Sequence, residues 1–164
     1  DSLTTGPEMR LLMEKLAELI GQGLSFEEVR DAGEAYLAST HLLFSLESLH
    51  NLAQNGRVSM LAAGAVGLLG IRILSRASAG GTIEPIEKCR GAKRAHEAMV
   101  QNMFALGYHG GKVRISHAEN PAAALRLQVA LHAQFPDADI TISPCRGLCC
   151  FYAERGGIIV GFET

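Results

Sequence analysis

Residues 44–90 read FSLESLHNLAQNGRVSMLAAGAVGLLGIRILSRASAGGTIEPIEKCR, and the rest of the chain is interpreted outward from this stretch. A short amphipathic segment leads into a turn at Asn55-Gly56-Arg57, and an uncharged run of small and apolar residues, Met60–Ile71, follows. Two strand-like segments then flank Gly80-Gly81, which predicts a β-hairpin. The stretch runs into the basic segment Lys88–Arg94. An apolar run with arginine near both edges predicts a surface that faces an apolar partner.

The flanking sequence predicts helices and strands in alternation. Apolar residues at helical spacing predict a helix over 9–20, and a capping box, Ser25–Glu28, predicts a second helix that ends near residue 38. Further helices are expected over 91–106 and 121–135, and strands over 41–45, 112–116, 139–143 and 157–162. This order predicts an α/β domain with a mixed β-sheet flanked by helices.

The composition narrows the classes of protein that the chain can belong to. It has 164 residues, 48% of them hydrophobic and none of them Trp, so we expect one aliphatic core of domain size. A net charge of −2 gives no general attraction for nucleic acid. No apolar run reaches the roughly 18–20 residues of a transmembrane helix, and no signal-peptide pattern is present. We therefore expect a cytoplasmic protein that has no nucleic-acid partner.

Several segments, in the order in which they occur, resemble the DegV family of bacterial fatty-acid-binding proteins. They are Gly56-Arg57-Val58-Ser59, Gly70–Leu74, Lys88–Gly91, Ile115–Pro121 and Gly156–Glu163. The resemblance implies a protein of two α/β domains, of which this chain is the C-terminal portion. Under it, residues 1–23 form an interdomain helix and residues 24–164 form the C-terminal α/β domain. The N-terminal domain of the same protein is then a further partner of this chain.

The resemblance also implies a function. A long-chain fatty acid lies in a tunnel between the two domains, and its carboxylate is presented to a partner fatty acid kinase. The carrier itself is then not an enzyme, and its ligand is the fatty acid rather than a cofactor. Arg57 and Arg90 are expected to meet a phosphate or the kinase, because a guanidinium group matches carboxylate and phosphate oxygens. The residues expected to contact the fatty acid are Met60, Ala63, Ala65, Leu68, Leu69, Ile71, Ile73, Tyr152 and Gly156.

Three of these expectations leave questions that the residues do not answer. The run Met60–Leu69 also has the composition of an ordinary buried helix, and the residues alone favour that interpretation. Tyr152 falls where the family typically has His, and a phenol donates a hydrogen bond but accepts no proton near neutral pH. The hydroxyl groups that hold the carboxylate belong to the N-terminal domain. Thr4 and Thr5 are the candidate substitutes nearest to the domain junction.

The cysteines and the basic segment support two alternative functions. A Cys-dependent hydrolase or transferase would use the cluster Cys145–Cys150, and it would need a thiol of lowered pKa beside a base. A lipid-free regulatory module would use the basic segment to bind an acidic partner. A metal site is not predicted, because a structural zinc site needs four well-placed ligands. We expect reduced thiols instead.

Overall fold

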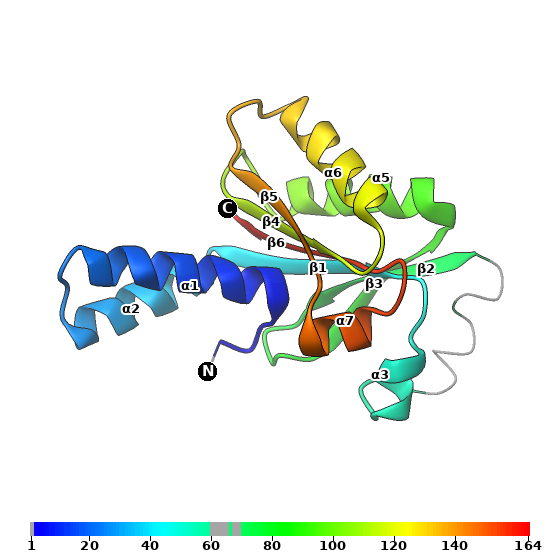
Figure 1. Ribbon diagram of the computed structural model, residues 1–164, viewed down its shortest axis with the longest axis horizontal. Coiled ribbons are helices and arrows are strands. Elements are labelled where there is room, and N and C mark those ends of the chain that lie inside the picture. Colours follow the sequence, from blue (N-terminus) through cyan, green and yellow to red (C-terminus); the bar gives the residue numbers. More distant parts are fainter. Residues whose placement is uncertain (1, 60–65, 67–69) are drawn as a thin grey trace.

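The computed structural model describes residues 2–59, 66 and 70–164, and its centre is a six-stranded sheet (Figure 1). The strands are β1 (Thr40–Leu46), β2 (Ile71–Ala77), β3 (Ile83–Arg90), β4 (Val113–His117), β5 (Ile140–Pro144) and β6 (Ile158–Glu163). Their order is β3-β2-β1-β6-β4-β5. Strands β4 and β5 are parallel, and the other neighbouring pairs are antiparallel. The predicted mixed sheet is confirmed.

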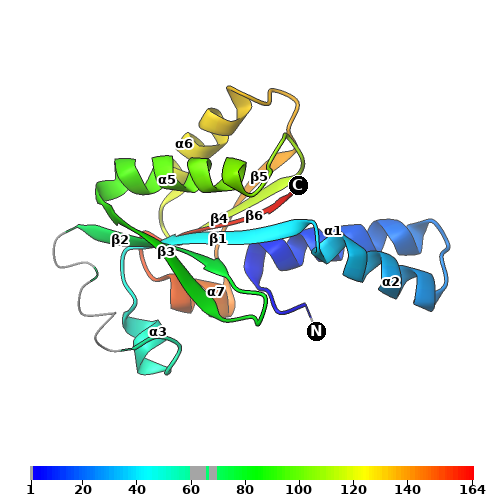
Figure 2. The ribbon, with the colours of Figure 1, turned by 180° about the vertical axis from the view of Figure 1, so that it is seen from behind.

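Helices cover both faces of this sheet. In the described part of the chain they are α1 (Gly6–Gly21), α2 (Phe26–Leu37), α3 (His50–Gln54), α5 (Gly91–Ala105), α6 (Pro121–His132) and α7 (Gly147–Ala153). Helices α5 and α6 lie on one face, whereas α1 and α7 lie on the opposite face (Figures 1 and 2). The predicted α/β class, with helices flanking the sheet, is therefore confirmed.

Local signals in the sequence account for several element boundaries. The Ser25 hydroxyl accepts a hydrogen bond from Glu28 N at 3.4 Å, and Ser25 N donates to Glu28 Oε2 at 2.8 Å. This confirms the capping box at the start of α2. The hairpin between β2 and β3 is also confirmed, because Ser78 N donates to Thr82 O at 2.8 Å across its turn. Helix α7 is an addition that the sequence patterns did not predict.

Alternation along the strands divides the core into two clusters. In β1, Leu43 points toward α5 and α6, where it joins buried residues such as Met103 and Phe162. Its neighbours Leu42 and Phe44 point to the other side of the sheet, where a second buried cluster forms. The sheet thus has two apolar sides, and each is packed against different helices.

Helix α1 is fixed to the sheet by a buried cation and by a close backbone approach. Arg114 of β4 is 5% exposed, and its Nη2 lies 2.6 Å from Glu14 Oε2 in α1 and 2.8 Å from Asp139 Oδ2. At Gly161 of β6, an added Cβ would collide with the backbone of Pro7 and Glu8, so only glycine lets α1 lie this close. The position of α1 is therefore tightly specified.

Candidate functional site

The second buried cluster lies on the side of the sheet that carries α3 and α7, and we call it the apolar face. Its buried members are Leu42, Phe44, Leu46, Leu49, Leu52, Val66, Ile73, Ala118, Ala153 and Ile159. They come from β1, β2, β6, α3, α7 and the segments between them. Ile71, Cys145, Cys149 and Tyr152 are partly buried against the cluster. The face is thus assembled from residues that are far apart in the sequence.

The structure places some of the predicted fatty-acid contacts on the apolar face. Ile73 is 6% exposed within it, and Ile71 and Tyr152 pack against it. Of the predicted apolar run Met60–Ile71, the structure describes Val66, Gly70 and Ile71. Val66 is buried in the same cluster. The remaining expected contacts, Met60, Ala63, Ala65, Leu68 and Leu69, lie outside the described residues.

Helices α3 and α7 bring the predicted polar end of the site to one edge of the apolar face. Asn51 in α3 donates from its backbone N to Glu154 Oε1 at 2.9 Å and from its side chain to Phe151 O at 2.8 Å. Arg57 closes the turn after α3, where its backbone N donates to Leu52 O at 2.8 Å. These hydrogen bonds hold α3, which is followed by the turn that carries Arg57, beside α7, which carries Tyr152.

Arg90 stands at a different place on the rim of the same face. It pairs with Ile71 in the register of β2 and β3, and directly paired residues of antiparallel strands share a face. Arg57 and Arg90 are both exposed, and neither side chain has an ion pair within residues 2–59, 66 and 70–164. Arg94, by contrast, lies 2.6 Å from Glu87. The two predicted arginines are thus available to an external anion.

Gly156 belongs to a different environment from the other predicted contacts. Its φ is +91°, its backbone N donates to Ala118 O at 2.8 Å, and its carbonyl accepts from Asn120 Nδ2 at 2.9 Å. A Cβ at this position would collide with the Glu47 carboxylate. Gly156 also lines a small cavity under α5 and α6 rather than the apolar face. Its expected contact with a fatty acid remains a prediction.

The thiol cluster is poorly suited to nucleophilic chemistry at Cys145. All four cysteines are free, and burial raises the pKa of Cys145 to about 12, with the neighbouring Cys149 and Cys150 adding to the shift. A thiol with this pKa is protonated at neutral pH, so it is a weak nucleophile.

In the described residues no group of three or more His, Cys, Asp and Glu side chains is arranged to hold a metal ion.

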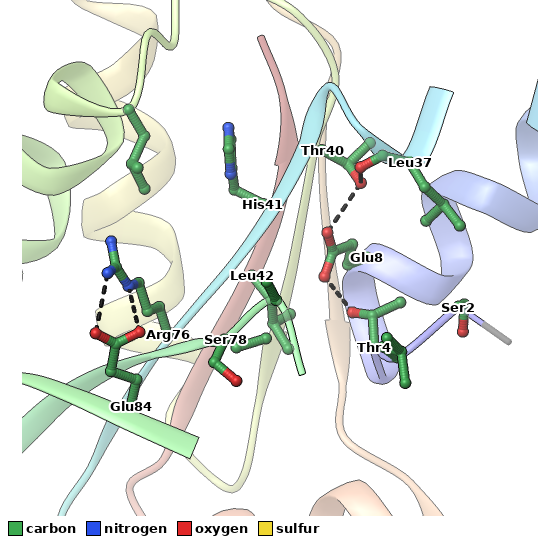
Figure 3. A pocket seen from close by; sticks show the side chains of 14 residues that line it. Ser2, Thr4, Glu8, Leu37, Thr40, His41, Leu42, Arg76, Ser78 and Glu84 are labelled. Atoms are coloured by element: carbon green, nitrogen blue, oxygen red, sulfur yellow. Dashed lines mark hydrogen bonds and ion pairs between the residues drawn. The ribbon is translucent and has the colours of Figure 1, made fainter. Parts of the chain in front are cut away.

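A larger cavity of about 440 Å³ lies between the N-terminal segment, β1 and the β2–β3 hairpin (Figure 3). Glu8 is 6% exposed in its wall, and its carboxylate accepts hydrogen bonds from Thr4 and from Thr40, the latter at 2.9 Å. Opposite it, Arg76 is paired with Glu84 at 3.0 Å. No sequence pattern predicted this cavity. A buried carboxylate in its wall repels a second carboxylate, so the cavity is unsuited to a fatty-acid head group.

The same geometry bears on the two threonines considered as head-group ligands. The Thr4 hydroxyl donates to Glu8, and the Thr5 hydroxyl lies 3.4 Å from Cys149 Sγ. Neither hydroxyl is therefore free to serve a carboxylate without first breaking a contact within this chain.

The structure contains no helix, among the residues described, that is long and apolar enough to cross a membrane.

Comparison with known proteins identifies relatives of the whole chain. The family described as "Uncharacterised protein, DegV family" matches residues 1–164. A DegV domain-containing protein of Streptococcus pneumoniae is 46% identical over 163 residues, which are 99% of this chain and 58% of that protein. The chain therefore spans less than two thirds of the length of the curated relatives that it matches.

Two solved structures are similar in both sequence and fold. A DegV family protein from Eubacterium eligens loaded with heptadecanoic acid has a TM-score of 0.96 and 46% identity, covering 100% of this chain and 59% of its own. The Fatty Acid Kinase (Fak) B3 protein of Streptococcus pneumoniae loaded with linoleic acid also has a TM-score of 0.96 and 46% identity, covering 99% and 58%. The fold described above is thus the fold of the corresponding part of both proteins.

Proposed function

Because this chain belongs to the DegV family, we propose that its apolar face is one wall of a binding site for a long-chain fatty acid. The observation that carries the proposal is the fatty acid bound by two relatives whose structures superimpose on nearly all of this chain. The apolar face supports it, because Ile71 and Ile73 of β2 and Tyr152 of α7 converge there. In this proposal Met60–Leu69 completes the wall.

The energetics of acyl-chain binding explain why a second wall is needed. Burying one methylene contributes about 0.8 kcal/mol, so about 14 methylenes contribute about 11 kcal/mol when they are fully buried. A single wall covers about half of the chain and contributes about half of that. Association costs at least about 4 kcal/mol before any side chain is ordered, so one wall leaves little net affinity. We therefore assign the opposite wall to an N-terminal domain of the same protein, with residues 1–23 as the interdomain helix and 24–164 as the C-terminal domain.

The polar end of the ligand is assigned to the edge at α3 and α7. Arg57 supplies a cation there, and the Tyr152 hydroxyl supplies a hydrogen-bond donor to a carboxylate or an acyl phosphate. Arg90 is assigned to docking of a partner fatty acid kinase, because it is exposed on the rim and free of an ion pair in the described chain. The carrier then presents the carboxylate and performs no catalysis itself. Since such a kinase uses ATP, we place the protein in the cytoplasm.

Native mass spectrometry of the purified protein tests the carrier function. We expect a bound mass equal to a fatty acid when the chain is produced together with the N-terminal portion that its relatives have. Acyl chains released by solvent extraction should match that mass. A protein with both portions that carries no lipid, and gains none when incubated with oleate, would refute the proposal.

Substitution of the two arginines separates presentation from binding. Arg57→Ala and Arg90→Ala should each keep the bound lipid but lower phosphorylation of the fatty acid by the partner kinase. Arg30→Ala is the matched control, because Arg30 is also an exposed arginine but lies on α2 and pairs with Asp31 at 2.7 Å. Normal phosphorylation in both rim variants would remove these assignments and leave the lipid site in place.

A further inference from the structure

The large cavity between the N-terminal segment, β1 and the β2–β3 hairpin has no part in the function proposed above. It lies where the pairing of β1 is one-sided. Strand β1 pairs with β6 from Thr40 onward, but with β2 only from Leu43 onward. This end of β1, which has no partner in β2, lines the cavity together with the turn end of the hairpin (Figure 3). The volume of about 440 Å³ is within the range of roughly 300–1,000 Å³ that small-molecule sites have.

Glu8 places a negative charge in the cavity wall that no cation of the described chain balances. Its side chain reaches from α1 toward the other lining residues (Figure 3), and the residue is 6% exposed. It forms no ion pair within residues 2–59, 66 and 70–164. Its position in the first turn of α1 favours a carboxylate, but by much less than the burial of an unpaired charge costs.

The hydrogen bonds that Glu8 accepts leave part of its carboxylate unused. The Thr4 hydroxyl donates to one oxygen, and the Thr40 hydroxyl lies 2.9 Å from the other. The single Thr40 proton is shared, because Leu37 O lies 3.1 Å from the same hydroxyl. A carboxylate offers about four lone-pair sites, so about two of them remain for a donor that enters the cavity.

His41 supplies a second acceptor, and the other charges of the lining cancel. The His41 ring packs on Phe162 with centroids 5.4 Å apart, and it forms no hydrogen bond to any residue that the structure describes. Burial lowers the pKa of His41, an effect that Glu8 opposes and Arg76 reinforces, so the imidazole is neutral near neutral pH and keeps one nitrogen that accepts. Arg76 Nε and Nη2 each lie 3.0 Å from an oxygen of Glu84. The remaining charge of the lining is therefore that of Glu8.

We propose that this cavity binds an organic cation with N–H donors, an ammonium or guanidinium group, which donates to Glu8 and His41. The apolar part of the ligand lies against Leu37, Leu42 and Leu106 in the same lining. The cation belongs either to a free small molecule or to a Lys or Arg side chain of the N-terminal portion that the relatives have, and the recognition chemistry is the same. None of the charged or hydroxyl groups involved belongs to the apolar face, so the proposal does not rest on the fatty-acid function.

The test is a titration of the ¹⁵N-labelled chain with n-butylammonium chloride and, separately, n-butylguanidinium chloride. Tetramethylammonium chloride at equal ionic strength is the control, because it carries the same charge but has no N–H donor. We expect saturable shifts of the Glu8, Thr40 and His41 amides with one or both butyl compounds and none with the control. Shifts that are absent, or that are equal in the control, would overturn the proposal.

The same titration of a protein that includes the N-terminal portion identifies the source of the cation. Saturable shifts in that protein as well assign the cavity to a free small molecule. Loss of binding there, together with a destabilisation by Glu8→Gln that the shorter chain does not show, assigns it to a basic side chain of the N-terminal portion. Loss of binding without this extra destabilisation would mean that an uncharged group covers the cavity, and the proposal would then be wrong.

Two matched pairs of variants locate binding in the cavity. Glu8→Gln should lower the affinity for butylammonium at least about tenfold, whereas Glu34→Gln, exposed on α2 and outside the lining, should change it less than about twofold. Ala79→Lys places a competing ammonium group at the cavity wall and should also weaken binding. Gly80→Lys is its control, because Gly80 lies outside the lining and an added Cβ meets only Ser78 Oγ, at 3.8 Å. The Lys pair leaves Glu8 intact and stays informative if Glu8→Gln is unstable, and equal effects within either pair would refute the site.

Discussion

The attachment of α1 to the sheet is predicted to depend on Glu14. In the structure, Arg114 Nε lies 3.0 and 2.9 Å from the two Glu14 oxygens, and Nη2 lies 2.6 Å from Oε2. The Arg114 side chain is 6% exposed, so its charge cannot be rehydrated when a partner is lost. Glu14→Gln removes the negative charge but keeps nearly the same shape. The position of α1, and of whatever precedes it in the protein, should depend on this contact.

The expected loss of stability follows from what remains around Arg114. Breaking a buried ion pair by removing one partner costs about 3–5 kcal/mol. Here Asp139 still lies 2.8 Å away, and the carbonyls of Val113 and Asp139 still accept hydrogen bonds. We therefore expect a smaller loss of about 2 kcal/mol in the free energy of unfolding. Glu18→Gln is the control, since Glu18 lies on the same helix in an exposed pair with Lys15 and should cost less than about 0.5 kcal/mol.

The pH dependence of the free energy of unfolding provides a second, independent test of this prediction. The hydrogen bond with Arg114 lowers the pKa of Glu14 below its ordinary value of 4.5. A carboxylate with a lowered pKa in the folded state contributes stability that is fully present above the unfolded value and is lost as the pH falls through the folded value. Urea unfolding followed by circular dichroism should show a gap between wild type and Glu14→Gln that is constant above about pH 5.5 and shrinks below pH 4.5. A gap that is independent of pH, or equal losses in both variants, would refute this account.

Three further predictions concern other parts of the molecule. Iodoacetamide should modify the exposed Cys150 at neutral pH while Cys145, with its pKa raised to about 12 by burial, stays unmodified, as peptide mass spectrometry can show. Gly161→Ala should lower the free energy of unfolding by about 1–3 kcal/mol because its Cβ has no room beside α1, whereas Gly21→Ala meets nothing within 4 Å and should not destabilise in the same denaturation assay. Tyr152→Phe should leave the melting temperature within about 2 °C of wild type, because the hydroxyl makes no hydrogen bond within the described chain. A larger drop would mean that the hydroxyl has a structural partner.

The secondary structure could be predicted wherever its cause is local. The capping box at Ser25, the hairpin around Gly80-Gly81 and the start of α6 at Pro121 each depend on residues a few positions apart. Helix α7 escaped prediction because its seven residues, GLCCFYA, lack both a helical polar–apolar period and a side-chain cap. It is held from outside, by the hydrogen bonds that Asn51 makes to the segment 151–154. A helix supported by distant contacts leaves no signal in its own sequence.

The same distinction separates the parts of the candidate sites that could and could not be predicted. Ile71 and Ile73 could be singled out from the sequence because they belong to one apolar stretch that resembles a known family, and the structure places both on the apolar face. The Arg72–Glu47 pair and the cavity under α5 and α6 were missed, because the residues that form them are brought together only when β1, β2 and two helix ends meet. No spacing rule connects Ser45 with Asn120. Sites of this kind become visible only after the sheet order is known.

The apolar face shows why sequence composition alone could not establish the function. An internal core and the wall of a lipid tunnel are both built from Leu, Ile, Val and Ala, because both must exclude water. What distinguishes them is the material on the other side: protein side chains in a core, and an acyl chain in a tunnel. The chain spans 58% of the length of a curated relative, and the proposed second wall belongs to the part of the relatives that it does not span. The residues of one wall therefore specify an apolar surface but not its occupant. The polar residues at the rim are more informative, because substitution of Arg57, Arg90 or Tyr152 can be tested in a kinase assay.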